Sequence, residues 1–210
     1  CRIQWTAAGG CATCLPSYGE QSMKRRIGLL IMGTLLSACA MAPSAPNPQV
    51  SEVSFGTVLP FGEVARVCDL ELSELGQLVE EPSARGYRLF DSQPGSAGAR
   101  SFYITGFADD CARQLTAANV LFGTPTVYEQ LHYGPGGENL PTAETDAAYE
   151  AIKARVCGAG RGKPCGRQIG KLDKTTFFVS AYERLGQTAR WSEVLVHDGA
   201  VAAVAMKSAN

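Results

Sequence analysis

The chain has 210 residues and a formal net charge of −1, from 19 basic and 20 acidic residues. Hydrophobic residues make up 45% of it and charged residues 19%, which is enough apolar material for a globular domain with its own core. This balance argues against a general nucleic-acid binder, which would be strongly basic, so we expect no nucleic acid among the partners.

Residues 1–22 open with Cys rather than Met and have no long apolar periodicity. We interpret them as upstream sequence, with the true start at Met23, since the Gly19-Glu20 pair can be encoded as GGAGA, a ribosome-binding core. Cys11 and Cys14 have CxxC spacing, but without a second pair we assign them no redox or metal role.

Residues 23–38 have the layout of a secretory signal peptide: three basic residues after Met23, a mainly apolar run over 27–36, and small residues before a break. The run is too short to span a bilayer, which takes about 20 helical residues. The segment Leu36-Ser37-Ala38-Cys39 resembles the lipobox of bacterial lipoproteins. The resemblance implies a diacylglyceryl group on Cys39, cleavage before it, and acylation (palmitate) of the new N-terminus.

Several acyl chains together anchor a protein stably, whereas one binds only marginally. Ala40 follows the lipid-bearing residue. By resemblance to the Gram-negative sorting rule, in which Asp at that position retains lipoproteins at the inner membrane, Ala implies the outer membrane. We therefore expect a cell-envelope protein, lipid-anchored at the outer membrane and facing the periplasm.

Residues 39–50 form the lipidated Cys and a proline-rich tether, and residues 51–210 form one globular domain. A tether of this kind reaches about 3.1 Å per residue. The mature chain has a net charge of −4, because the removed part contains four of the 19 basic residues and one of the 20 acidic ones: Arg2, Lys24, Arg25, Arg26 and Glu20.

The mature domain contains four cysteines, Cys68, Cys111, Cys157 and Cys165. An even number in an exported chain indicates two disulfides, with three possible connectivities. We favour Cys157–Cys165, which flanks a short glycine-rich loop, together with Cys68–Cys111. A zinc or redox site is the alternative, but the spacing is not that of a zinc finger, and we expect no metal and no cofactor.

The first half of the domain mixes strand and turn signals. Residues 53–68 suggest short strands or bends, and residues 74–81 fit either a strand or a helical turn. Residues 86–92 and 100–107, rich in aromatic and β-branched residues, predict two strands. A helix is predicted over 111–122, where Cys111, Leu115, Ala118 and Phe122 recur at helical spacing before Gly123.

Pro125 is expected to exclude further helix nearby. A second helix is predicted from Thr145 as N-cap, with Ala148, Ile152 and Val156 on one face and Gly158 as its stop. Residues 175–183, 190–197 and 200–206 predict a three-strand meander, in which Asp198-Gly199 makes a two-residue turn. The fold class is α+β: one small domain, mainly antiparallel sheet, with about two helices on one face.

The best candidate site is the segment 155–174, which carries six cations against one acid, Asp173. Its glycines allow backbone amides to form an anion-binding concavity, which a Cys157–Cys165 bridge would pre-organise. The ligand would be an anionic lipid head group, a glycan acid or an acidic partner, and the alternative is a merely solvated loop. The candidate anion-binding residues are Arg155, Arg161, Lys163, Arg167, Lys171 and Lys174. A P-loop is rejected, because the spacing is one residue short and Pro164 replaces the hydroxyl residue.

Catalytic signals are weak, and no catalytic residue is assigned. His197-Asp198 is the one His–Asp neighbour pair, which we interpret as turn residues that point away from each other. There is no G-x-S-x-G motif, and His132 is interpreted as a partly buried structural residue. The domain's cysteines are expected to be oxidised and so unable to act as nucleophiles.

Two further sets of residues are given structural interpretations. Asp109 and Asp110 are interpreted as dipole-favouring residues before a helix rather than as a cation site. Trp191, Tyr103 and Phe177 are interpreted as core residues rather than a sugar-stacking platform.

The expected function is a non-catalytic binding or structural role in the envelope. The expected partners are the membrane, through the lipid, and an envelope protein or an anionic envelope polymer. The alternative is an envelope hydrolase acting on peptidoglycan or lipid. A deep pocket lined by His132 or His197 beside a carboxylate would favour that alternative.

Overall fold

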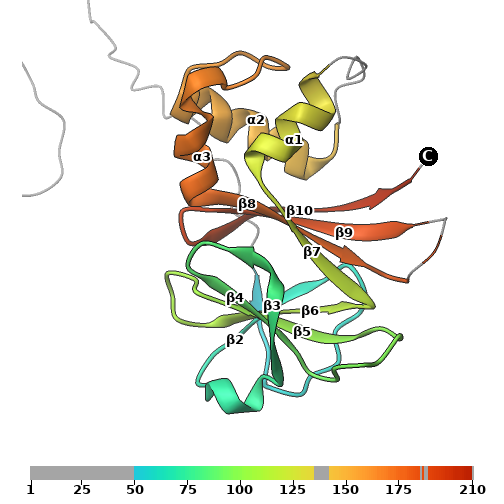
Figure 1. The fold of residues 1–210 in the computed structure, drawn as a ribbon. Helices are drawn as coiled ribbons and strands as arrows, with labels where there is room; N and C mark the ends of the chain where they lie inside the picture. The colour runs from blue at the N-terminus through green and yellow to red at the C-terminus, as the bar shows by residue number, and fades with distance from the viewer. Residues whose placement is uncertain (1–49, 135–141, 185, 187–188, 210) are drawn as a thin grey trace, which may run out of the picture. The chain divides into compact units, whose positions relative to one another are not determined.

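A computed structural model describes residues 50–134, 142–184, 186 and 189–209. Two β-sheets and a set of helices make up this part of the chain, with the helices on the outer face of the second sheet (Figure 1). The upstream sequence, signal peptide and tether expected over residues 1–49 lie outside the described residues. None of the helices within these ranges combines the length and apolar composition that a membrane crossing requires.

The first sheet has six strands in the order β1-β2-β6-β5-β4-β3. β1 runs parallel to β2, and the other neighbours are antiparallel. A short 3-10 helix, η1 (Leu72–Glu74), precedes β3. The strands are β1 (Ser51–Glu52), β2 (Val64–Val67), β3 (Gln77–Ala84), β4 (Tyr87–Asp91), β5 (Arg100–Thr105) and β6 (Ala112–Ala117).

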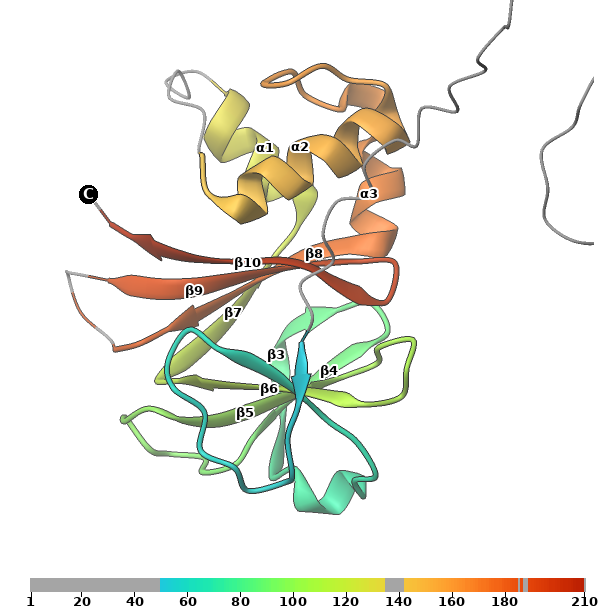
Figure 2. The same ribbon diagram turned by 180° about the vertical axis from the view of Figure 1, so that it is seen from behind.

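The second sheet has four antiparallel strands in the order β10-β9-β8-β7 (Figure 2). They are β7 (Asn119–Gly123), β8 (Thr176–Tyr182), β9 (Arg190–His197) and β10 (Ala200–Ser208), so the predicted meander is confirmed. Asp198 and Gly199 join β9 to β10 with φ values of 46° and 79°. Positive φ at both positions is what a two-residue hairpin turn of the right twist requires, as the sequence predicts.

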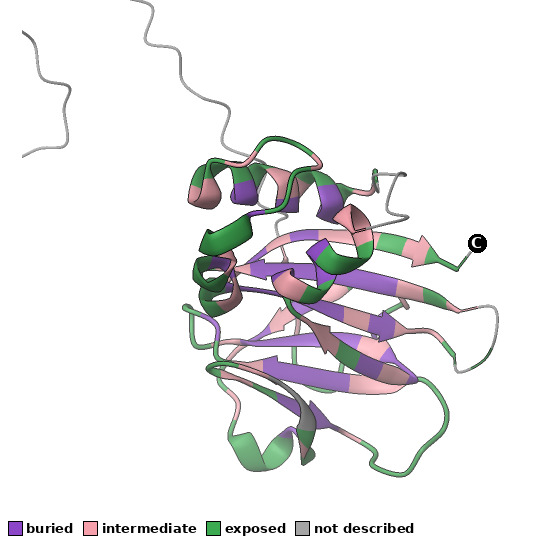
Figure 3. Ribbon diagram, turned by 45° about the horizontal axis from the view of Figure 1, so that its top comes forward, coloured by how far each residue is buried: buried purple, intermediate pink, exposed green. Residues whose placement is uncertain are grey.

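Alternation along β8 shows how the second sheet is buried on both faces. Phe177, Val179 and Ala181 point into the core between the two sheets, whereas Phe178 points toward the helices. Both faces of the central strands are buried in consequence (Figure 3). Each large apolar side chain removed from water in this way contributes about 1.5–3 kcal/mol.

Three helices pack on the outer face of the second sheet: α1 (Pro125–Tyr133), α2 (Glu144–Cys157) and α3 (Ile169–Thr175). Tyr128 of α1 stacks on Phe178, with ring centroids 4.6 Å apart and planes 7° from parallel. Ile152 and Leu172 are buried in the same cluster. The predicted α+β class with mainly antiparallel sheet is confirmed, and the structure adds a second sheet and a third helix.

The helix predicted over 111–122 is wrong, because this stretch forms β6 and β7. Leu115 and Ala117 lie in the core between the sheets, while Gln114 and Thr116 face the opposite side, where they donate to the carbonyls of Thr57 and Leu59. Polar and apolar residues do alternate over residues 114–117, but this run is short, and the apolar spacing of Cys111, Leu115, Ala118 and Phe122 imitates a helix.

Pro125 does not exclude a helix but begins one. It occupies the first turn of α1, where a missing N–H costs nothing, and the Thr124 hydroxyl accepts a hydrogen bond from Val127 N at 3.2 Å. The second predicted helix is confirmed, although it begins at Glu144 after Ala143 rather than with Thr145 as N-cap. Gly158 ends it with φ of 66°, as predicted.

The two favoured disulfides are confirmed. Cys68 and Cys111 are bonded with Cα atoms 4.4 Å apart, and Cys157 and Cys165 with Cα atoms 5.4 Å apart. The first joins the end of β2 to the start of β6, and the second joins the end of α2 to the segment before η2 (Gly166–Gln168).

Candidate functional site

The basic segment 155–174 contains more regular structure than its glycines suggest. It comprises the end of α2, a turn region, η2 and the seven-residue helix α3. The Cys157–Cys165 bond closes the turn region at its base. The segment is therefore attached to the helical layer at both ends rather than being a free loop.

Two carboxylates of the protein itself accept hydrogen bonds from backbone amides of this segment. Gly162 N donates to Glu150 Oε1 at 3.1 Å, and Cys165 N donates to both oxygens of Glu129, at 3.1 and 2.9 Å. Tyr149 Oη also donates to Glu129, at 2.9 Å. These two amides are thus not free for an external anion, and the concavity inferred from the glycines instead binds α1 and α2.

The six cations of the segment all lie on the surface. Each is exposed, and none forms an ion pair with any residue in the described ranges. Lys171 Nζ donates to the uncharged Gln168 Oε1 at 2.9 Å. We call this set the basic surface: Arg155, Arg161, Lys163, Arg167, Lys171 and Lys174.

A second candidate site is a groove of about 650 Å³ between α1 and the uncovered part of the second sheet. Phe178, Leu195 and Ala203 form a cross-strand row beneath the helices. The next two rows on the same face extend past them and supply five of the groove's lining residues. These are Ser180, Tyr182, Trp191, Glu193 and Lys207.

Charged groups in the groove wall form a compact network. Lys207 Nζ lies 2.7 Å from Asp146 Oδ1 and 2.5 Å from Glu193 Oε1. Tyr128 Oη donates to Asp146 at 2.9 Å, and Thr145 Oγ1 donates to Glu193 at 2.6 Å. Burial raises the pKa of Tyr128, and the charge of Asp146 raises it further, so its hydroxyl stays protonated as the donor.

His132 lines the same groove, on α1. Burial lowers its pKa, more than the nearby Asp146 carboxylate raises it, so the ring is neutral at pH 7. Its ring packs on Tyr128, with centroids 4.3 Å apart. Within the described part of the chain it hydrogen-bonds to no carboxylate. The ring is partly buried, as predicted, but it also lines the groove.

The aromatic residues divide between core and groove. Tyr103 and Phe177 are buried in the core, as predicted, but Trp191 is half-exposed and lines the groove. Its ring centroid lies 5.7 Å from that of Tyr182. The available sequence signal was Glu193, the one acid in strand β9, because alternation places residues 191 and 193 on one face.

His197 and Asp198 do not point away from each other, contrary to the expectation. Their Nε2 and Oδ2 atoms lie 3.1 Å apart, and His197 Nδ1 is 2.8 Å from Thr176 Oγ1. Burial lowers the pKa of His197 more than Asp198 raises it. The pair lies at the β9–β10 turn and does not line the groove.

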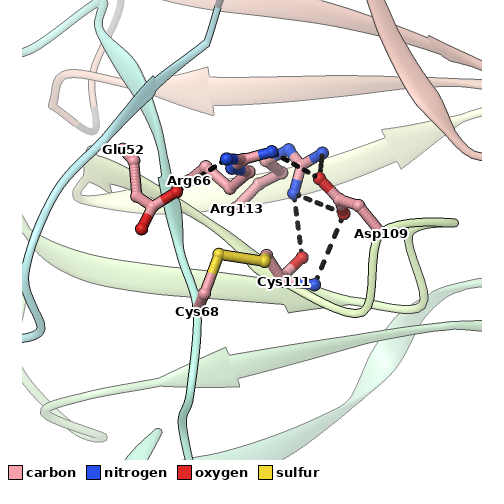
Figure 4. Close-up of polar contacts among 6 residues, drawn as sticks. All are labelled: Glu52, Arg66, Cys68, Asp109, Cys111 and Arg113. Atoms are coloured by element: carbon pink, nitrogen blue, oxygen red, sulfur yellow. Dashed lines mark hydrogen bonds and ion pairs between the residues drawn. A yellow bond between two sulfur atoms is a disulfide. The ribbon is translucent and has the colours of Figure 1, made fainter.

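Asp109 has a structural role different from the expected one, since no helix follows it. Its carboxylate accepts from Arg113 at 3.0 and 2.8 Å and from Arg66 at 3.4 Å, beside the Cys68–Cys111 bond (Figure 4). The described ranges contain no cluster of three or more His, Cys, Asp or Glu residues that could hold a metal ion.

Comparison of the chain with known protein families, with curated proteins and with solved structures finds no match.

Proposed function

We propose that the chain is a lipid-anchored cell-envelope protein with a non-catalytic binding role on the periplasmic side, exercised through the basic surface. The supporting observation is that six cations share one attached segment and none is ion-paired within the described residues. Their positive charge is not neutralised by an ion pair within these residues, and an external anion would supply the missing counter-charge.

The nearest anions available to such a protein are the phosphates of the membrane that holds its anchor. This step rests on the lipid predicted at Cys39 and on the tether predicted over residues 40–49. Ten residues in extended proline-rich geometry reach about 30 Å. Because exposed charges are screened beyond about 8 Å at physiological salt, the tether must bring the basic surface into near contact for it to act.

Lysine acetylation of the protein lipidated at Cys39, in lipid vesicles, tests this role. In vesicles containing phosphatidylglycerol, we expect Lys163, Lys171 and Lys174 to react more slowly than in phosphatidylcholine vesicles, with Lys207 as internal reference. The protection should disappear at about 0.5 M NaCl, where screening is strong. Equal reactivity in both vesicles would rule out anionic lipid head groups as the partner.

A pair of variants with the same change in net charge supplies the control. Arg161→Glu/Arg167→Glu should abolish the protection. Arg88→Glu/Arg190→Glu changes two cations outside the basic surface and should leave it intact. If both variants behave alike, net charge rather than this surface governs the contact.

The alternative, an envelope hydrolase, is favoured by one observation: His132 lines the groove beside Asp146 and Glu193. Two features weigh against it. Both carboxylates already bind Lys207 Nζ, at 2.7 and 2.5 Å, so each is engaged within the protein rather than directed at a substrate. His132 also has no hydrogen-bonded carboxylate among the described residues to orient it. Release of soluble fragments from peptidoglycan or lipid, lost in His132→Ala, would establish the hydrolase instead.

A further inference from the structure

We propose that the groove is a binding site for an uncharged saccharide, separate from the basic surface. Its volume of about 650 Å³ lies within the range of sites for small ligands.

The charges in the groove wall disfavour both kinds of ion. Lys207 Nζ already lies between Asp146 and Glu193, at 2.7 and 2.5 Å, where a cationic ligand would have to sit. The same two carboxylates outweigh the single ammonium, so an anion would meet a net negative wall. A purely apolar ligand would cover these charged groups without hydrogen-bonding to them, which is costly.

The polar atoms left over in the wall suit hydroxyl groups. Glu193 Oε2, Ser180 Oγ and Trp191 Nε1 have no hydrogen-bond partner among the described residues, although their residues line the groove. A carboxylate oxygen accepts and an ammonium donates, so Glu193 and Lys207 side by side match two neighbouring hydroxyls.

The apolar part of the groove suits the face of a sugar ring. Trp191 and Tyr182 lie together on the floor, with centroids 5.7 Å apart and planes 33° from parallel. Val127 and Leu131 of α1 also line the groove and are 48% and 70% exposed, so apolar surface remains for contact. A sugar ring can place its apolar face on the aromatic side chains while the hydroxyls at its rim hydrogen-bond to Glu193 and Lys207.

Tryptophan fluorescence tests the proposal, because the chain has two tryptophans, Trp5 and Trp191. In the full chain with Trp5→Phe, Trp191 in the groove is the reporter. We expect a saturable emission shift with at least one of three uncharged probes: triacetylchitotriose, maltotriose or cellotriose. Spermidine and citrate, as cationic and anionic probes, should cause none.

Two variants locate the effect. Tyr182→Ala removes the neighbour of Trp191 and should weaken saccharide binding by about tenfold, the size of an aromatic contact. Phe55→Ala is the matched control, because it also removes one ring of an aromatic pair but lies outside the groove. Phe55 is 45% exposed, and its ring centroid lies 5.7 Å from that of Tyr103 on the first sheet. No shift with any saccharide up to about 10 mM, near the weak limit of useful affinity, would overturn the proposal. So would a preference for spermidine or citrate, or equal effects of the two variants.

Discussion

At the scale of single residues, a buried charge pair joins β4 to β5. Asp91 accepts from Arg100 Nε at 2.7 Å and from Nη2 at 2.6 Å, and both side chains are about nine-tenths buried. Asp91→Asn should lower the free energy of unfolding by about 3 kcal/mol, because a buried guanidinium loses its counter-charge. Urea denaturation measures the change.

A surface pair provides the comparison. Arg66 and Glu52 approach to 2.6 Å, yet 38% and 56% of their side chains are exposed. Glu52→Gln should therefore leave the urea midpoint almost unchanged, because water screens the pair. A loss as large as that of Asp91→Asn would show that short distance rather than burial sets the energy.

The lysine of the groove network is expected to be equally important. Lys207→Met leaves Asp146 and Glu193, which are 1% and 7% exposed, without their shared cation. We expect a loss of about 3 kcal/mol in the free energy of unfolding, the cost typical of breaking a buried pair. Lys171→Met, in an exposed lysine, should cost little. A tolerated Lys207→Met would mean that water reaches both carboxylates.

At the scale of elements, the two disulfides close loops of very different length, with sequence separations of 43 and 8. In the chain-entropy model the longer loop contributes about 4 kcal/mol and the shorter about 2.6 kcal/mol. Cys68→Ala/Cys111→Ala should thus destabilise more than Cys157→Ala/Cys165→Ala in urea. The reverse order would point to native-state packing of Cys165 as the larger effect.

The elements that the sequence predicts are those with a clear local pattern of residues. β4, β5 and the β8–β10 meander are short aromatic and β-branched runs between turn residues, and these signals are local. The sequence does not predict β6 and β7, because the period-two pattern covers only residues 114–117 and apolar residues recur at helical spacing over 111–122. α3 was missed because its seven residues carry glycine and lysine, and Leu172 is its one buried side chain.

At the scale of the whole domain, the basic surface is contiguous in sequence but the groove is not. The groove combines α1, the start of α2 and four strands, from Gly123 to Ser208. Periodicity places Trp191 and Glu193 on one face of β9, but only the fold shows that this face extends past the helices. Tertiary packing decides which strand face stays open, and that information is not local.

The pH dependence of stability also belongs to the whole domain, since its titrating groups lie in separate layers. Removal from water raises the pKa of Asp91 and of Asp109, but hydrogen bonds from Arg100 and Arg113 outweigh it, so both pKa values lie below the ordinary value. The pKa of Glu150 is lowered in the same way, burial being outweighed by Lys153 and other donors.

The two histidines shift in the same direction for a different reason. Burial lowers the pKa of His132 and of His197, so the folded protein takes up their protons less readily than the unfolded chain does. For every one of these groups the folded pKa is depressed. Their stabilising contributions are therefore present above the unfolded pKa and are lost as pH falls toward the folded value.

Two windows of acid destabilisation follow. The free energy of unfolding should begin to fall below about pH 6.5, where unfolded histidines protonate, and fall again below about pH 4, where unfolded carboxyls protonate. Urea titrations at intervals from pH 8 to pH 3 measure both. His132→Gln should reduce the first decline and leave the second in place. Stability that rises between pH 7 and pH 5 would contradict the assignment, because it would require a folded state that binds protons more tightly than the unfolded chain.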